Sequence, residues 1–90
     1  MPYIKDRKEI DQFLGPLLAV IGGEGMLPFT TGELNYMITR IVDTWAVPNG
    51  DYGAYNSVIG VLECVKQEYY RRRVAVYEDR KKEENGEVYV

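Results

Sequence analysis

Apolar residues recur at helical spacing near the start of the chain. Six of them lie three or four positions apart and predict one apolar face on a helix that begins near Asp6: Ile10, Phe13, Leu14, Leu17, Leu18 and Ile21. Pro16 lacks a backbone N–H and its ring crowds the preceding turn, so we expect the helix to kink or split there. The glycines that follow end it, and the segment from Gly22 to Thr31 is expected to be an irregular connector.

A second helix is predicted from about residue 30. Thr30 and Glu33 have the spacing of a capping box, in which each side chain accepts a hydrogen bond from the other residue's backbone N–H. Its expected buried face consists of Leu34, Ile38, Ile41 and Trp45. Pro48, Asn49 and Gly50 then favour a turn.

The third predicted helix is long, with Asp51 as its N-cap and an end near Lys82. Its main apolar face is Val58, Leu62, Val65, Tyr69 and Val76. At about 100° per residue, Ser57, Gly60 and Cys64 fall on a different side, where small residues would let another helix approach closely. After a turn at Asn85 and Gly86, alternating residues predict a short extended C-terminal tail that docks on its own domain or on a second subunit.

These patterns predict an all-α fold: one domain over residues 1–90, with three helices of which the last is long. A chain of this size should bury roughly 60 to 65% of the surface that its unfolded form exposes. The long helix has two sides suited to packing, and two short helices cannot cover both. We therefore expect a homodimer or a larger homo-oligomer.

Composition and charge argue against two classes of binding partner, nucleic acids and membranes. The net charge of −3 opposes electrostatic attraction to nucleic acid or to an anionic membrane. The longest apolar run, residues 13–21, is about half the roughly 20 residues needed to span a bilayer, so no membrane partner is expected. The single cysteine cannot form an intramolecular disulfide and no signal-peptide pattern opens the chain, which favours the cytoplasm.

Candidate catalytic chemistry is sparse. The chain has no histidine, and this removes the commonest general base near neutral pH and the commonest transition-metal ligand. Cys64 has no histidine to activate it, so we interpret it as a helix-contact residue. We predict no catalytic residue, no cofactor and no resident metal.

Two alternatives remain open. Arg71, Arg72 and Arg73 follow Tyr69 and Tyr70, and arginines beside aromatic rings can bind nucleic acid or a nucleotide phosphate. Successive helical side chains point in different directions, however, and this favours a solvated or salt-bridged surface. A metal-dependent hydrolase is the weaker alternative. It would use acidic residues of the third helix, but their spacing does not place several of them on one face: Glu63, Glu68, Glu78, Asp79, Glu83 and Glu84.

Tyrosine is the one residue in excess, with eight in ninety positions. A small domain cannot bury all of these rings, and rings outside the core are common at protein interfaces. Tyr36 projects away from the second helix's apolar face, beside Arg40. The predicted interaction residues are Tyr36, Arg40, Ser57, Gly60, Cys64, Tyr70, Arg71 and Tyr77.

About two thirds of the chain resembles a family of short, uncharacterised proteins of bacteria and their viruses, classed as a domain of unknown function. Three blocks carry the resemblance: residues 32–40 (GELNYMITR), residues 62–72 around Leu62-Glu63-Cys64, and residues 77–89 from Tyr77-Glu78-Asp79 to Glu84-Asn85-Gly86-Glu87-Val88-Tyr89. The resemblance implies domain limits and a phage or prophage origin, and no activity. Our leading hypothesis is a small, non-enzymatic interaction or regulatory protein.

Overall fold

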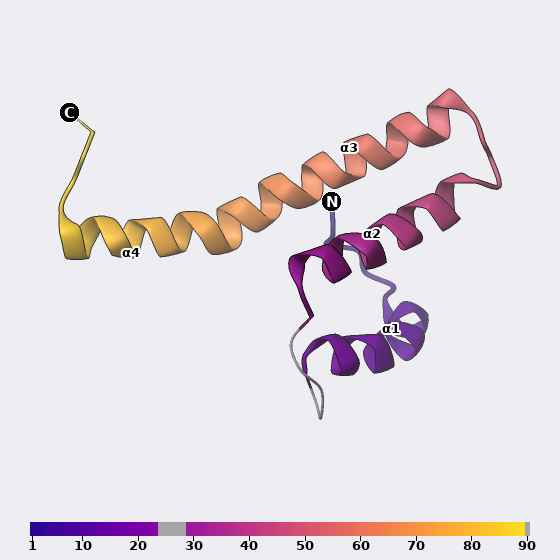
Figure 1. Cartoon of the computed structure of the whole chain (residues 1–90), viewed down its shortest axis with the longest axis horizontal. Coiled ribbons are helices and arrows are strands. Elements are labelled where there is room, and N and C mark those ends of the chain that lie inside the picture. Colours follow the sequence, from indigo (N-terminus) through magenta and orange to yellow (C-terminus); the bar gives the residue numbers. More distant parts are fainter. Residues whose placement is uncertain (24–28, 90) are drawn as a thin grey trace.

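The computed structural model describes residues 1–23 and 29–89, and every regular element among them is helical. The elements are α1 (Lys8–Ile21), α2 (Thr31–Ala46), α3 (Tyr52–Tyr69), the π-helical turn η1 (Tyr70–Val74) and α4 (Ala75–Asn85) (Figure 1). The last three are continuous and form one helix of 34 residues. The all-α prediction with a long C-terminal helix is confirmed.

The starts of α2 and α3 form where the sequence predicts them. At the start of α2, Thr30 Oγ1 accepts a hydrogen bond from the Glu33 backbone N–H at 3.1 Å, and Thr30 N–H donates to Glu33 Oε1 at 2.7 Å. Asp51 Oδ1 accepts from the Ala54 N–H at 2.8 Å and caps α3. Gly86 ends α4 with a φ of +98°, a conformation that only glycine adopts without strain. The capping box and the Asp51 cap are both confirmed.

The first helix differs from its prediction at two points. The first helix is not split at Pro16 but runs unbroken through it, because a 14-residue helix tolerates the loss of one backbone hydrogen bond. It begins at Lys8 rather than near Asp6. Part of the expected connector between the first two helices, residues 24–28, lies outside the described residues.

The long helix contains a π-turn that the apolar periodicity did not predict. The Ala75 N–H donates to the Tyr70 carbonyl five residues earlier, where an α-helix would use the residue four earlier. The extra residue in this turn moves Val76 off the apolar face of Val58 and Leu62, so the prediction of one face from Val58 to Val76 is wrong. The helix also extends to Asn85, past the predicted end at Lys82.

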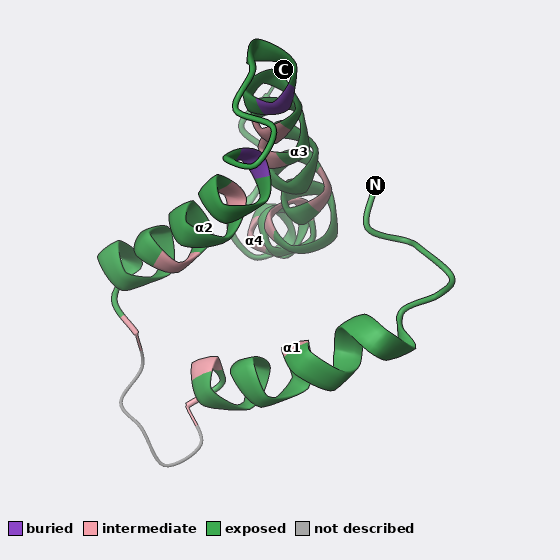
Figure 2. Cartoon of the chain, turned by 90° about the vertical axis from the view of Figure 1, so that its right-hand side faces the viewer, coloured by how far each residue is buried: buried purple, intermediate pink, exposed green. Residues whose placement is uncertain are grey.

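The helices form an open arrangement (Figures 1 and 2). Among the described helices that are not continuous with each other, only α2 and α3 bring Cα atoms within 8 Å. The two buried side chains of the described residues are Ala46, 2% exposed, and Ala54, 8% exposed, at the two sides of the α2–α3 turn. The radius of gyration is 17.1 Å, whereas a compact 90-residue domain has one of about 12 Å.

Among residues 1–23 and 29–89, the expected hydrophobic core is therefore not formed. Residues predicted to be buried are exposed: Phe13 is 70% exposed, Ile41 57% and Trp45 58%. Leu34, Ile38, Val65 and Tyr69 are exposed as well, and Val58 and Leu62 are half-buried. The reason is geometric, because α1 lies apart from the other helices and the long helix projects beyond the α2–α3 contact (Figure 1).

Candidate interaction surface

An apolar groove lies between α2 and α3. The two helices meet at Ala46 and Ala54, whose small side chains allow close approach, and they diverge away from the turn (Figure 2). The groove has a volume of about 320 Å³. Its lining consists of apolar side chains: Ile41, Val42, Trp45, Val58 and Val61.

A second groove, of about 510 Å³, lies between α1 and α2. Most of its lining is apolar: Leu17, Ile21, Phe29, Leu34, Met37, Ile38 and Ile41. Ile41 lines both grooves, so the two form one continuous hydrophobic area across three helices. We call the lining residues of both grooves the apolar surface.

Two predicted interaction residues belong to this surface. Tyr36 and Arg40 line the α1–α2 groove together with Glu33, and these three are its polar members. Arg40 Nη1 donates a hydrogen bond to the Tyr36 hydroxyl at 3.4 Å. The polar groups of the apolar surface therefore come from one helix, α2, and include one acid and one base.

The side of α3 that carries Ser57, Gly60 and Cys64 is open over most of its length. The Ser57 hydroxyl donates to the Gly53 carbonyl at 2.9 Å, and a Cβ atom built at Gly60 would meet no atom within 4 Å. Cys64 is exposed and lines a shallow depression together with Met1 and Pro2. The chain's own N-terminal segment thus lies beside Cys64, at one end of this side.

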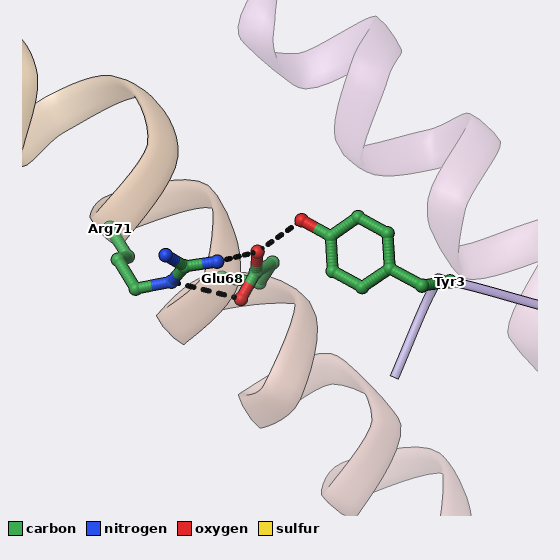
Figure 3. Close-up of polar contacts among 3 residues, drawn as sticks. All are labelled: Tyr3, Glu68 and Arg71. Carbon is green, nitrogen blue, oxygen red and sulfur yellow. Dashed lines mark hydrogen bonds and ion pairs between the residues drawn. The ribbon is translucent and has the colours of Figure 1, made fainter.

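Tyr3 anchors that N-terminal segment to the long helix (Figure 3). Its hydroxyl donates a hydrogen bond to Glu68 Oε1. The same carboxylate accepts two bonds from Arg71, with Nη2 at 2.6 Å from Oε1 and Nε at 3.3 Å from Oε2. This contact was not predicted from the sequence, because Tyr3 and Glu68 are 65 residues apart and no local pattern connects them.

The Tyr3 contact and the ion pair shift the proton affinities of all three groups. The Arg71 guanidinium, and then the Tyr3 hydroxyl, hold the pKa of Glu68 below its ordinary value. Donation to Glu68 raises the pKa of Tyr3, and pairing with Glu68 raises that of Arg71. Arg71 is therefore already engaged by an acidic partner within its own chain.

The remaining predicted residues lie on the part of the long helix that extends beyond the α2–α3 contact, residues 69–85, which we call the projecting half. The Tyr77 ring has the Arg80 guanidinium carbon 5.8 Å and the Lys81 ammonium 5.6 Å from its centroid, so its π face is near two cations of α4. Tyr70 is exposed in η1. The eight predicted residues thus do not converge on one site. Ile41 and Trp45 were predicted only as core residues, and Val61 was not singled out.

None of the helices in residues 1–23 and 29–89 is both long enough and apolar enough to cross a membrane. Nor do three or more cysteine, aspartate or glutamate side chains gather there closely enough to hold a metal ion.

Comparison with known proteins gives one match. The sequence profile of a family described as a domain of unknown function, DUF6899, matches residues 1–88. No curated protein and no solved structure matches the chain significantly. The match covers nearly the whole sequence, and the chain therefore belongs to the DUF6899 family.

Proposed function

We propose that this chain is a small, non-enzymatic interaction or regulatory protein of the cytoplasm that works as a homodimer or as a subunit of a larger assembly. The apolar surface is the observation that carries the proposal. Contiguous exposed apolar areas larger than a few hundred Å² are rare on monomeric proteins and mark sites where another molecule binds. Here apolar side chains line two adjoining grooves across α1, α2 and α3, and Ile41, Trp45 and Val61 among them are more than half exposed.

The chemistry of the surface supports binding rather than catalysis. Both grooves are lined mainly by aliphatic side chains and Trp45, which contribute binding energy through burial and cannot transfer protons. The charged members, Glu33 and Arg40, are partly engaged already, in the α2 capping box and with Tyr36. A phage or prophage origin is part of the proposal, supported by the resemblance of residues 32–40, 62–72 and 77–89 to short proteins of bacteria and their viruses.

The only tryptophan of the chain provides the test, because Trp45 lies in the α2–α3 groove. We would measure acrylamide quenching of its fluorescence together with the solution mass and the radius of gyration. The proposal expects either an assembly that shields Trp45 or an open monomer that leaves it accessible. A monomer with shielded Trp45 and a radius of gyration near 12 Å would contradict it, since such a chain would have closed on its own apolar surface.

Binding of nucleic acid or a nucleotide phosphate is the second candidate. The observation that favours it is that Tyr70, Arg72 and Arg73 are all exposed on the projecting half of the long helix. Arg71 contributes less than the sequence suggested, because Glu68 holds its guanidinium. Titration with single-stranded DNA separates the candidates: phosphate contacts would lose affinity steeply between about 50 and 200 mM salt, whereas apolar association would weaken little.

A further inference from the structure

We infer that the occupant of the apolar surface is a second copy of this chain, which presents the same surface across a two-fold axis. This inference rests on the proposed function and identifies the partner. Its evidence is the exposed area of the chain, the small number of buried residues and the charges on the surface.

The exposed area indicates how much surface a partner must cover. The chain exposes 8361 Å², whereas a compact protein of 10.4 kDa exposes about 5,400 Å². The excess is about 3,000 Å² per chain. A stable interface of standard size buries about 800 Å² on each partner, and obligate homodimers bury considerably more. The excess is therefore large enough for an obligate interface.

The lack of an internal core indicates that the partner is a permanent one. Ordering a chain of this length costs conformational entropy on the order of 1 kcal/mol or more for each residue, and burial of apolar surface must offset that cost. Within the described residues, Ala46 and Ala54 alone are buried. A transient partner cannot supply the missing burial throughout the life of the protein. A second copy of the chain can supply that burial, because it is synthesised together with the first.

The charge pattern is compatible with self-pairing. The surface carries Glu33 and Arg40 on α2, one acid and one base, and the rest of its lining is uncharged. In a two-fold interface, the same patch of each copy packs against its counterpart on the other copy. When the two patches lie antiparallel, the acid of one copy faces the base of the other. The net charge of −3 on each copy is screened over about 8 Å at physiological salt and does not oppose close apolar contact strongly.

Two isoleucines provide a matched test. Ile41, 57% exposed, lies in both grooves, whereas Ile59, 66% exposed on α3, lies in neither. The substitutions Ile41→Glu and Ile59→Glu make the same chemical change on a helix surface. Sedimentation equilibrium should show a wild-type dimer and an Ile59→Glu dimer of similar affinity. Ile41→Glu should weaken dimerisation by at least about 100-fold, because the dimer would bury an uncompensated carboxylate.

A second measurement keeps the inference testable if Ile41→Glu fails to fold. In the wild-type protein, dilution below the dimer dissociation constant should increase acrylamide quenching of Trp45 in step with the loss of dimer. A wild-type monomer with accessible Trp45 would overturn this inference and leave the proposed function standing. A compact monomer with shielded Trp45 would overturn both. A dimer that tolerates Ile41→Glu but is broken by Ile59→Glu would move the interface to another face.

Discussion

The α2–α3 turn and the projecting half of the long helix, Tyr69–Asn85, are stabilised in different ways. At the turn, two helices meet at Ala46 and Ala54, and the apolar groove opens directly beside them. The projecting half contacts no other described helix except the parts of the long helix with which it is continuous. Its side chains interact locally instead: Lys81 with Glu84 at 3.2 Å, and Tyr77 with the cations of Arg80 and Lys81.

This difference shows that one chain can contain helices stabilised by contact with each other and helices stabilised by local side-chain interactions. A helix rich in ion pairs three or four residues apart gains a few tenths of a kcal/mol from each pair and remains solvated. A helix with an aliphatic face gains stability only when that face is covered. Changes near the turn should therefore affect the stability of the whole protein, while changes in the projecting half should have small effects.

The largest effect on the free energy of unfolding is expected when a larger side chain is placed in the contact between α2 and α3. Ala54→Leu adds three carbon atoms to a side chain that is 8% exposed, and it should lower the free energy of unfolding by about 1 to 3 kcal/mol. Ala75→Leu makes the same change at the start of α4, where the half-buried side chain meets no separate described helix, and should lower the free energy of unfolding by less than Ala54→Leu does. Urea denaturation at one fixed protein concentration measures both. Equal effects of the two substitutions would contradict the contrast between the regions.

The next largest effect concerns the start of α2. Thr30→Ala removes the hydroxyl that accepts a hydrogen bond from the Glu33 N–H, and it should lower the free energy of unfolding by about 1 kcal/mol. Thr31→Ala changes the adjacent residue, whose side chain is not part of the box, and serves as the control. Thermal denaturation followed by circular dichroism should show a lower midpoint for the Thr30 variant alone. Identical midpoints for both variants would mean that the capping box does not contribute to stability.

A smaller effect is expected in the projecting half. Lys81→Ala removes an exposed ion pair and a cation near the Tyr77 ring, and should cost less than about 0.5 kcal/mol. Raising the salt concentration should reduce that small cost further, because exposed charges are screened. Urea denaturation at low and high salt is the measurement. A cost above 1 kcal/mol would show that the projecting half packs against a partner.

Loss of the Tyr3–Glu68 contact should have the smallest effect on global stability, because it releases only the N-terminal segment. The folded pKa of Glu68 is depressed below its ordinary 4.5, so the contribution of its contacts is present above pH 4.5 and is lost as the pH falls through the folded pKa. The pKa of Tyr3 is raised, so the contribution of its hydrogen bond is present below pH 10 and is lost as the pH rises through that raised value.

Nuclear magnetic resonance of the Tyr3 ring checks this prediction at both ends of the pH range. The ring signals should shift towards those of a free segment in acid and again in strong base. Tyr3→Phe should release the segment at every pH without changing the midpoint of global unfolding. Ring signals that stay constant as Glu68 protonates would show that the contact does not hold the segment in place.

The sequence predicted local structure more fully than tertiary structure. The caps at Thr30 and Asp51 depend on neighbouring residues, so they could be read directly. Apolar faces could be read only where the helix stays regular, and the face predicted from Val58 to Val76 failed at the π-turn. Whether Trp45 is covered depends on which other segments reach it, and residue spacing carries no such information. The Tyr3–Glu68 contact was missed for the same reason, since it joins segments from opposite ends of the chain.

The candidate site was predicted in part. Tyr36 was identified because its ring projects away from the apolar face of α2, and Arg40 because it lies beside Tyr36. Both residues line the apolar surface. Ile41 was predicted as a core residue, and Val61 was not singled out. The reason is that an apolar residue that faces a partner has the same helical spacing as one that faces its own core. Whether any of the predicted interaction residues contacts a partner stays a prediction.

The π-turn at Tyr70–Val74 has a consequence for how the family can vary. A π-turn holds one residue more than the α-helical turn that it replaces, which is the geometry left by a single-residue insertion. Deleting one residue within the turn, such as Arg72, would restore regular α-helix and leave the side chains of α4 facing almost the same way relative to α3, because the turn already accommodates the extra residue. Deleting a residue within the regular helix of α3 would instead rotate all of α4 by about 100° relative to the start of α3. A relative that is one residue shorter at the π-turn would therefore present the same α4 side chains, Tyr77 among them, to the same neighbour.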